Sequence, residues 1–342
     1  HAGLETPVKT ARMEKVCIVG LGSIGGFVAH RLVEGGRPVS ALARGATLAA
    51  VRRHGLVLRD AKDPDRGRAV SIAASDSAHE LGPQDLVILS VKTTALPSIP
   101  DSIRPLLGPD TVVLSAMNGV PWWFFHGLGA RWRDTRLDAT DPGGGLARAI
   151  PPARVVGCVV HMSASSPEPG VVRHAAGDRF IVGEPGGASS ARLDAVASLL
   201  RAGGLSVETT PRIELEVWLK LWGNATMNPV SALTGATMDR ILDDPLVRRF
   251  VSDAMAEAAA IGAAIGLPIG MTPEERHAIT RKLGAVRTSM LQDADAGRPI
   301  ELDALAGAVC EMGRLVGLDT PNFDALLGLT RLFGQVRGLV PD

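Results

Sequence analysis

A glycine-rich loop between a strand pattern and a helix pattern restricts the fold of this chain more than any other feature. The apolar run 16–20 (VCIVG) leads directly into GLGSIGG at 20–26, and an amphipathic helix pattern built on Ile24, Val28 and Leu32 follows. Glycines permit a tight turn and the close approach of a pyrophosphate, which a helix N-terminus attracts. This order of elements predicts a dinucleotide site, although a purely structural glycine turn is the alternative. The predicted contacts are Gly20, Gly22, Ser23, Ile24 and Gly25.

The first half of the chain continues to alternate short apolar runs with helical patterns. Strands are predicted at 37–43, 85–91 and 110–116, and the alternation is typical of a parallel sheet with crossover helices. Continuous apolar runs suit strands that are buried on both faces. Weaker patterns at 155–161, 170–173 and 179–182 predict a partly antiparallel extension of this sheet.

Long helical patterns replace the strands after residue 210. Because 342 residues exceed the usual size of one hydrophobic core, we expect two domains. The predicted fold class is an α/β Rossmann-type dinucleotide-binding domain at 13–210, followed by a mostly α-helical substrate domain at 211–342. Residues 1–12 lack a signal-peptide core and are expected to form a flexible extension.

The overall charge, the apolar runs and the cysteine spacing argue against several kinds of partner and against a bound metal. Lys plus Arg equals Asp plus Glu at 36 each, so nothing favours nucleic acid or an anionic membrane. The weakly polar run 254–271 contains Glu257 and breaks at Pro268, so no transmembrane segment is predicted. Three widely spaced cysteines show no metal or disulfide spacing, and we expect a cytoplasmic protein without a bound metal.

Three polar residues follow predicted strands at the sheet edge where open α/β folds bind ligands. Arg44 comes directly after the second strand, 19 positions beyond Gly25, where an NAD-preferring site would carry an acidic residue. A guanidinium there favours the 2′-phosphate of NADP, and a solvated surface arginine is the alternative. Lys92 and Asn118 each either contact cofactor or substrate or close a strand-to-loop turn.

A polar stripe crosses an otherwise apolar helix pattern in KLWGNATMN, residues 220–228. Residues four apart share one helix face, so Glu216, Lys220, Asn224 and Asn228 are predicted to line up beside buried tryptophans. Unpaired buried polar groups cost about 1 to 3 kcal/mol each, so a buried stripe needs partners, water or a ligand. The stripe therefore either lines a ligand cleft, or it lies on the surface with Glu216 and Lys220 as an ion pair and the asparagines in solvent. A lysine beside a reducing cofactor could protonate a ketone oxygen.

The segment 288–307 reads as a helix end, a turn and a new helix that begins around Pro299. Glu301 would then occupy the first turn of the new helix, where a carboxylate complements the helix dipole. That structural role is sufficient to account for Glu301 from the pattern alone.

Taken together, GLGSIGG, SVKT, MNG, KLWGNATMN, and SMLQD followed by IELD resemble the ketopantoate reductase (2-dehydropantoate 2-reductase) family. The resemblance runs from about residue 13 to about 335. The Lys-x3-Asn-x3-Asn element and the interval from Ser289 to Glu301 are more specific than the glycine loop.

The resemblance implies NADPH-dependent reduction of a 2-oxo acid, with ketopantoate to pantoate in pantothenate biosynthesis as the first candidate, in a cleft between the two domains. Lys220 is similar to the family's general acid, and Glu301 to its assisting carboxylate. Substrate-binding positions are matched by Asn118, Asn224, Asn228 and Ser289. Cofactor-binding positions are matched by Arg44, Lys92 and Asn118. The partner is then a small 2-oxo acid, and a homodimer is one option for the assembly.

Two other functions stay open on the sequence. A β-hydroxyacid or 6-phosphogluconate type dehydrogenase shares a Rossmann domain, a helical domain and a catalytic lysine, and the Ser289–Glu301 interval argues against it. A non-catalytic NADP-binding metabolite sensor is disfavoured by the presence of both Lys220 and Glu301.

Four consecutive aromatic residues, 122–125, depart from the compact family pattern. They either pack in a core or line the substrate cleft, and the second alternative would allow a bulkier substrate than ketopantoate.

Overall fold

The computed structural model describes residues 13–341, so the predicted extension 1–12 lies outside the described part. Backbone contacts divide the chain into two compact units. Within the described residues, unit 1 contains 13–91, Asp101–Ala116 and Ala153–Ile213, and unit 2 contains Lys92–Pro100, Met117–Pro152 and 214–341. This division differs from the predicted contiguous domains 13–210 and 211–342, because two segments of the first half fold into unit 2.

The strands of unit 1 form one sheet, which has ten strands within the described residues, in the order β4-β3-β9-β8-β7-β6-β1-β2-β5 with β10 beside β9. The strands are β1 (Val16–Val19), β2 (Ser40–Leu42), β3 (Leu56–Asp60), β4 (Asp63–Val70), β5 (Ala73–Ser75), β6 (Gln84–Leu89), β7 (Leu107–Ser115), β8 (Val155–Glu168), β9 (Val171–Gly183) and β10 (Ser206–Thr209). Strands β8, β7, β6, β1, β2 and β5 run parallel, as predicted for the first half. The β8–β9 pair is antiparallel, which confirms the predicted extension.

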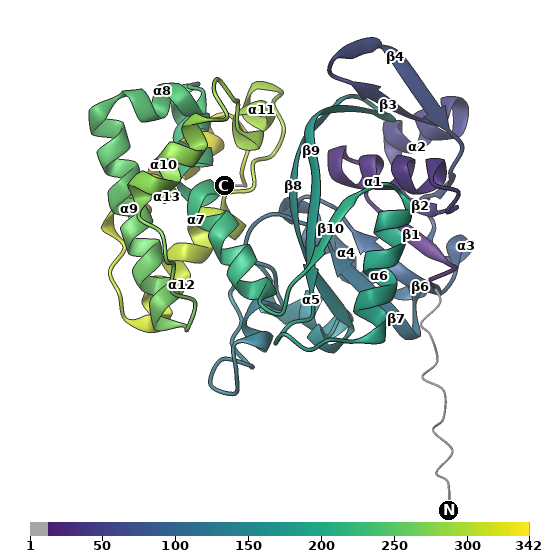
Figure 1. The fold of residues 1–342 in the computed structure, drawn as a ribbon, viewed down its shortest axis with the longest axis horizontal. Coiled ribbons are helices and arrows are strands. Elements are labelled where there is room, and N and C mark those ends of the chain that lie inside the picture. The colour runs from purple at the N-terminus through teal and green to yellow at the C-terminus, as the bar shows by residue number, and fades with distance from the viewer. Residues whose placement is uncertain (1–12, 342) are drawn as a thin grey trace, which may run out of the picture. The chain divides into compact units, whose positions relative to one another are not determined.

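Helix α1 (Ser23–Glu34) packs inside the curve of this half-barrel sheet, against β3, β8 and β9 (Figure 1). Its side chains are therefore buried on almost every face rather than along one stripe. A Cβ at Gly26 would lie 2.6 Å from Val172 Cγ2, so the close approach of α1 to β9 requires a glycine. Unit 1 also contains α2 (Gly45–His54), α3 (Ala78–Leu81) and α6 (Ala191–Ala202).

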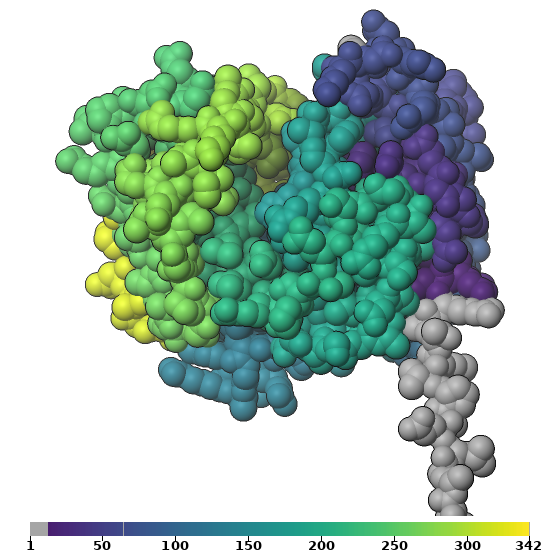
Figure 2. Space-filling model, in the orientation of Figure 1, coloured from purple at the N-terminus to yellow at the C-terminus, as the bar shows by residue number. Residues whose placement is uncertain are grey.

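Four strands were not predicted, namely β3, β4, β5 and β10. Strand β4 reads DPDRGRAV, is mostly exposed and, among the described strands, pairs only with β3, so its sequence has no buried face to reveal it. The β3–β4 hairpin forms the projecting edge of the sheet in Figures 1 and 2. The predicted strands 170–173 and 179–182 are two ends of the single strand β9.

Unit 2 is mostly α-helical, in agreement with the predicted fold class. Its helices include α7 (Ile213–Thr234), α8 (Met238–Asp243), α9 (Pro245–Ala264), α10 (Pro273–Arg281), α11 (Ser289–Asp295), α12 (Ala308–Val316) and α13 (Pro321–Val336). Trp218 and Trp222 of α7 and Phe323 of α13 are fully buried and anchor the core. Within the described residues, none of the helices is both long and apolar enough to cross a bilayer.

The aromatic run 122–125 packs in the core of unit 2. All four rings are buried; Trp122 Nε1 donates to the carbonyl of Ile150 at 2.9 Å, and the Phe124 ring lies 6.1 Å from that of Trp218. The packing alternative therefore accounts for this segment, and these residues give no reason to expect a bulkier substrate.

Candidate active site

The glycine loop of unit 1, residues 20–26, follows β1, and the Ser90 hydroxyl contacts the backbone at its start. The Ser90 hydroxyl lies 3.0 Å from the Gly20 carbonyl oxygen and 3.2 Å from that of Val19. A Cβ at Gly25 would lie 2.0 Å from the Gly20 oxygen and 2.2 Å from Ser90 Oγ. Only glycine fits at this position, because any side chain would push helix α1 away from the loop.

The outer side of the same loop is open. A Cβ at Gly22 would meet no atom within 4 Å, and Gly22 is the N-cap of α1. The first turn of α1 carries no acidic side chain. The exposed N–H groups and the helix dipole therefore suit an anionic pyrophosphate.

Arg44 lies two residues beyond β2, at the N-cap of α2, and is exposed. This is the expected place at the carboxyl end of the second strand. A guanidinium and a helix N-terminus both attract phosphate there.

The polar stripe lies on a single helix, α7, as predicted. Lys220 and Asn224 are half-buried, while Asn228 is 5 % exposed. Lys220 Nζ donates to Asn118 Oδ1 at 2.7 Å, although the two residues are 102 positions apart. Asn118 follows β7 by three residues and belongs to unit 2 with the lysine.

Glu301 completes a cluster of predicted residues in unit 2. Its Oε1 accepts hydrogen bonds from Thr93 N at 2.8 Å and Thr93 Oγ1 at 3.1 Å. Asn118, Asn228, Ser289 and Glu301 line one small pocket. Five of the predicted residues are thereby gathered around this pocket, counting Lys220 through its hydrogen bond to Asn118.

The predicted helix beginning around Pro299 is wrong in detail. Glu301 lies outside any helix, before a π-helical turn, η6 (Asp303–Gly307), and α12 starts only at Ala308. A carboxylate in this position is held by Thr93 rather than by an α-helical first turn. π-Helical turns are frequent at functional sites.

Lys92 is placed differently from the other predicted cofactor residues. It belongs to unit 2, and its ammonium forms an ion pair with Asp293 of α11. Arg298 Nε also donates to Asp293, at 3.0 Å. The sequence analysis assigned no role to Asp293 or Thr93, because their partners Lys92 and Glu301 are far away in the sequence. Asp293 is nevertheless the last residue of the SMLQD motif.

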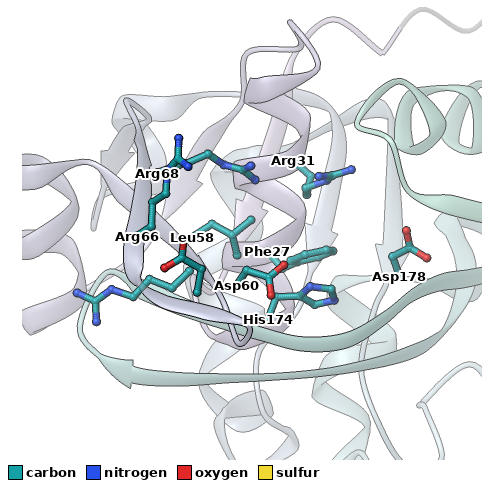
Figure 3. A pocket seen from close by; sticks show the side chains of 10 residues that line it. Phe27, Arg31, Leu58, Asp60, Arg66, Arg68, His174 and Asp178 are labelled. Atoms are coloured by element: carbon teal, nitrogen blue, oxygen red, sulfur yellow. The ribbon is translucent and has the colours of Figure 1, made fainter.

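A larger pocket, of about 390 Å³, lies in unit 1 and contains none of the predicted site residues (Figure 3). The stacked rings of Phe27 and His174 lie at its side, with centroids 4.7 Å apart. Arg68 pairs with Glu34, and Arg31 donates to the carbonyls of residues 203 and 204. The lining contains both arginine and aspartate side chains, so the pocket favours no particular ligand charge.

Two family models match the chain. "Ketopantoate reductase PanE/ApbA" covers residues 16–122, and "Ketopantoate reductase PanE/ApbA C terminal" covers residues 212–333. A 2-dehydropantoate 2-reductase from Mesorhizobium japonicum is 43% identical over 325 residues, which span 95% of this chain and 99% of that protein. The chain belongs to the ketopantoate reductase family.

Solved structures agree with this membership of the ketopantoate reductase family. A candidate ketopantoate reductase from Ralstonia solanacearum MolK2 is 50% identical with a TM-score of 0.91, covering 96% of this chain and 100% of that one. The 2-dehydropantoate 2-reductase from Geobacter metallireducens is 26% identical with a TM-score of 0.79, covering 93% and 99%. This ketopantoate reductase family member is accordingly an oxidoreductase with a Rossmann-like unit and a helical unit.

Proposed function

We propose that this protein reduces a 2-oxo acid to a 2-hydroxy acid with NADPH, with 2-dehydropantoate as the first substrate to test. One observation carries the proposal: the Lys220 ammonium is oriented by Asn118 at 2.7 Å, on a helix whose Asn228 shares a pocket with Ser289 and Glu301. The relatives of this chain named as 2-dehydropantoate 2-reductases support the choice of substrate.

The residues of unit 1 fit a phosphorylated dinucleotide. The loop around Gly22 leaves room for a pyrophosphate, and Arg44 at the N-cap of α2 suits a 2′-phosphate. When bound, NADPH supplies the hydride that reduces the carbonyl carbon. Nothing in this fit requires Lys92, whose ammonium is paired with Asp293.

Lys220 is the proposed proton donor. The carbonyl oxygen gains negative charge as its carbon is reduced, and an ammonium at hydrogen-bond distance stabilises this charge and then transfers a proton to it. Asn118 accepts one of the three ammonium protons, and this hydrogen bond orients Lys220. The lysine regains its proton from solvent after each turnover.

Glu301 and the asparagines are proposed to position the substrate. Thr93 fixes Glu301 through two hydrogen bonds to the same oxygen, Oε1. The carboxyl group thus retains acceptor capacity for a substrate hydroxyl or for a lysine. Asn224 and Asn228 supply neutral donors and acceptors along the same face of α7.

The rival readings predict different reactions. A β-hydroxyacid type dehydrogenase would oxidise 3-hydroxy acids with NADP, and a metabolite sensor would bind NADPH tightly without turnover. The shared pocket of Ser289, Glu301 and Asn228 favours the proposed reductase. The homodimer stays a prediction, which light scattering can test.

The decisive experiment is NADPH consumption with 2-dehydropantoate and with a panel of branched and aromatic 2-oxo acids. We expect saturable turnover, fastest with 2-dehydropantoate. Oxidation of 3-hydroxy acids alone, or tight NADPH binding without turnover on any 2-oxo acid, would reject the proposal in favour of one of the rivals.

A further inference from the structure

Arg276, on helix α10, is a half-buried cation that lacks a partner. No hydrogen bond or ion pair engages its guanidinium within residues 13–341, and its Nε is buried without an acceptor. Burial lowers the pKa of Arg276, and no carboxylate offsets that effect. An unpaired buried charge is costly, so a guanidinium kept in this state is expected to serve a ligand.

The guanidinium lies directly over helix α7, at Gly223. A Cβ added to Gly223 would lie 3.0 Å from Arg276 Nη2 and 3.3 Å from Nε. Gly223 is three residues after Lys220, so these two positions are neighbours on the helix surface. Glycine at this position lets the guanidinium approach the helix beside the polar stripe.

Two other cations close to the candidate site are already engaged in ion pairs. Lys92 and Arg298 both pair with the buried carboxylate of Asp293. The substrate proposed above carries a carboxylate beside its ketone, and the ketone is assigned to Lys220. A second cation over Gly223, three residues along α7 from that lysine, suits this adjacent arrangement, and a planar guanidinium can bind both carboxylate oxygens.

We propose that Arg276 binds the carboxylate of the 2-oxo acid, and that the space over Gly223 exists to admit its guanidinium to the face of α7 that carries Lys220. This inference rests on the proposed function, since it assigns one end of the same substrate. It makes Arg276 a substrate-binding and specificity-determining residue that sequence reasoning did not single out.

The test compares Arg276→Met with the wild type on a 2-oxo acid and on the corresponding uncharged 2-oxo amide. Methionine keeps an apolar stem and removes the charge and the donors. We expect kcat/KM for the acid to fall roughly tenfold to a hundredfold, as for loss of a charged hydrogen bond, with little change for the amide. Arg276→Lys should recover part of the loss, because it keeps the charge without the paired donors.

The matched control is Arg249→Met, which removes an exposed arginine from α9 and should leave both substrates unaffected. Equal losses on acid and amide for Arg276→Met, or no loss on the acid, would overturn the assignment. A melting temperature of Arg276→Met several degrees below that of the wild type, measured without ligand, would also overturn it. That result would mean that the guanidinium stabilises the fold instead of serving a ligand.

A binding measurement separates this inference from the proposed function. Calorimetric titration of the 2-oxo acid into the NADP-saturated protein should give weaker binding to Arg276→Met than to the wild type, whether or not turnover occurs. If the wild type binds the acid through Arg276 but never consumes NADPH, the reductase proposal fails and the carboxylate site stands. If both proteins bind the acid equally, the carboxylate site fails.

Discussion

A lysine that donates a proton must be held towards its acceptor, and at the scale of single residues this is the function we assign to Asn118. The amide oxygen takes one ammonium proton at 2.7 Å and so limits the rotation of a long, flexible side chain. Fixing the donor lowers the entropy that must be lost when the substrate binds.

Lys220→Ala should therefore abolish most turnover while NADPH binding stays near normal. We expect kcat to fall about 10² to 10⁴-fold, the usual contribution of a positioned general acid. Steady-state kinetics with a fluorescence titration of NADPH checks both halves. Lys282→Ala, which removes an exposed lysine at the end of α10, is the control and should behave as the wild type. Near-normal turnover in Lys220→Ala would remove the lysine from the mechanism.

Arg44→Asp should shift the cofactor preference from NADPH towards NADH. The substitution removes the proposed phosphate partner at the N-cap of α2 and introduces a carboxylate that can bind ribose hydroxyls. We expect the ratio of kcat/KM for the two cofactors to change by about tenfold or more, as for loss of a charge-assisted hydrogen bond. Arg53→Asp, on the exposed surface of the same helix, is the matched charge change. An unchanged ratio in Arg44→Asp would refute the phosphate assignment.

At the scale of elements, the loop after β7 is fixed by its contact with the π-helical turn η6. Gly119 has a φ of +81°, and the N–H of Val120 donates to the carbonyl of Ala304 at 2.9 Å. A Cβ at Gly119 would lie 2.7 Å from both the Cβ and the carbonyl oxygen of Ala304. The neighbouring Asn118 therefore depends on this glycine for its position.

Gly119→Ala should lower both stability and turnover. A left-handed backbone costs a side chain roughly 1 kcal/mol or more, and here the clash with η6 adds to that cost. Gly129→Ala isolates the backbone contribution, because Gly129 has a φ of +94° and nothing within 4 Å. Urea unfolding and kcat should both show the larger effect for Gly119→Ala. Equal losses of stability and unchanged kcat would contradict the role of this contact.

Prediction of elements from the sequence succeeded where burial leaves a periodic pattern. The strands β1, β6 and β7 and the helix α7 have long apolar runs or a clear helical repeat. Strand β4 and the π-helical turn η6 have neither, because one is an exposed edge and the other depends on its tertiary contacts.

At the scale of the whole molecule, each unit contains a histidine that is almost fully buried. Burial lowers the pKa of His30 in unit 1 and of His277 in unit 2, where Arg248 and Arg281 act in the same direction. The pKa of each histidine is therefore lower in the folded protein than its ordinary value of about 6.5. At pH values below 6.5 the unfolded chain then binds more protons than the folded protein does. The protein should thus be fully stabilised above that pH and lose stability as pH falls from about 6.5 towards the folded values.

Thermal unfolding between pH 8 and pH 5 measures this loss. His277→Gln should make the melting temperature less sensitive to acid, since one of the two protonations is removed. At pH 8 the variant should be somewhat less stable than the wild type, because the contact of His277 with Ser252 at 2.8 Å is lost. His54→Gln, an exposed position, should leave the profile unchanged. An identical acid dependence in His277→Gln and the wild type would disprove the histidine contribution.

The sequence by itself determined the features that depend on short-range geometry. A glycine loop between strand and helix and a four-residue polar step on one helix need only local periods and steric limits, so Gly25 and the Lys220 stripe could be identified directly. Only the tertiary structure decided the partners: Asn118 for Lys220, Thr93 for Glu301, Asp293 for Lys92 and Gly223 beneath Arg276. These pairs join segments 53 to 208 positions apart, and such contacts depend on how the entire chain packs rather than on any local pattern.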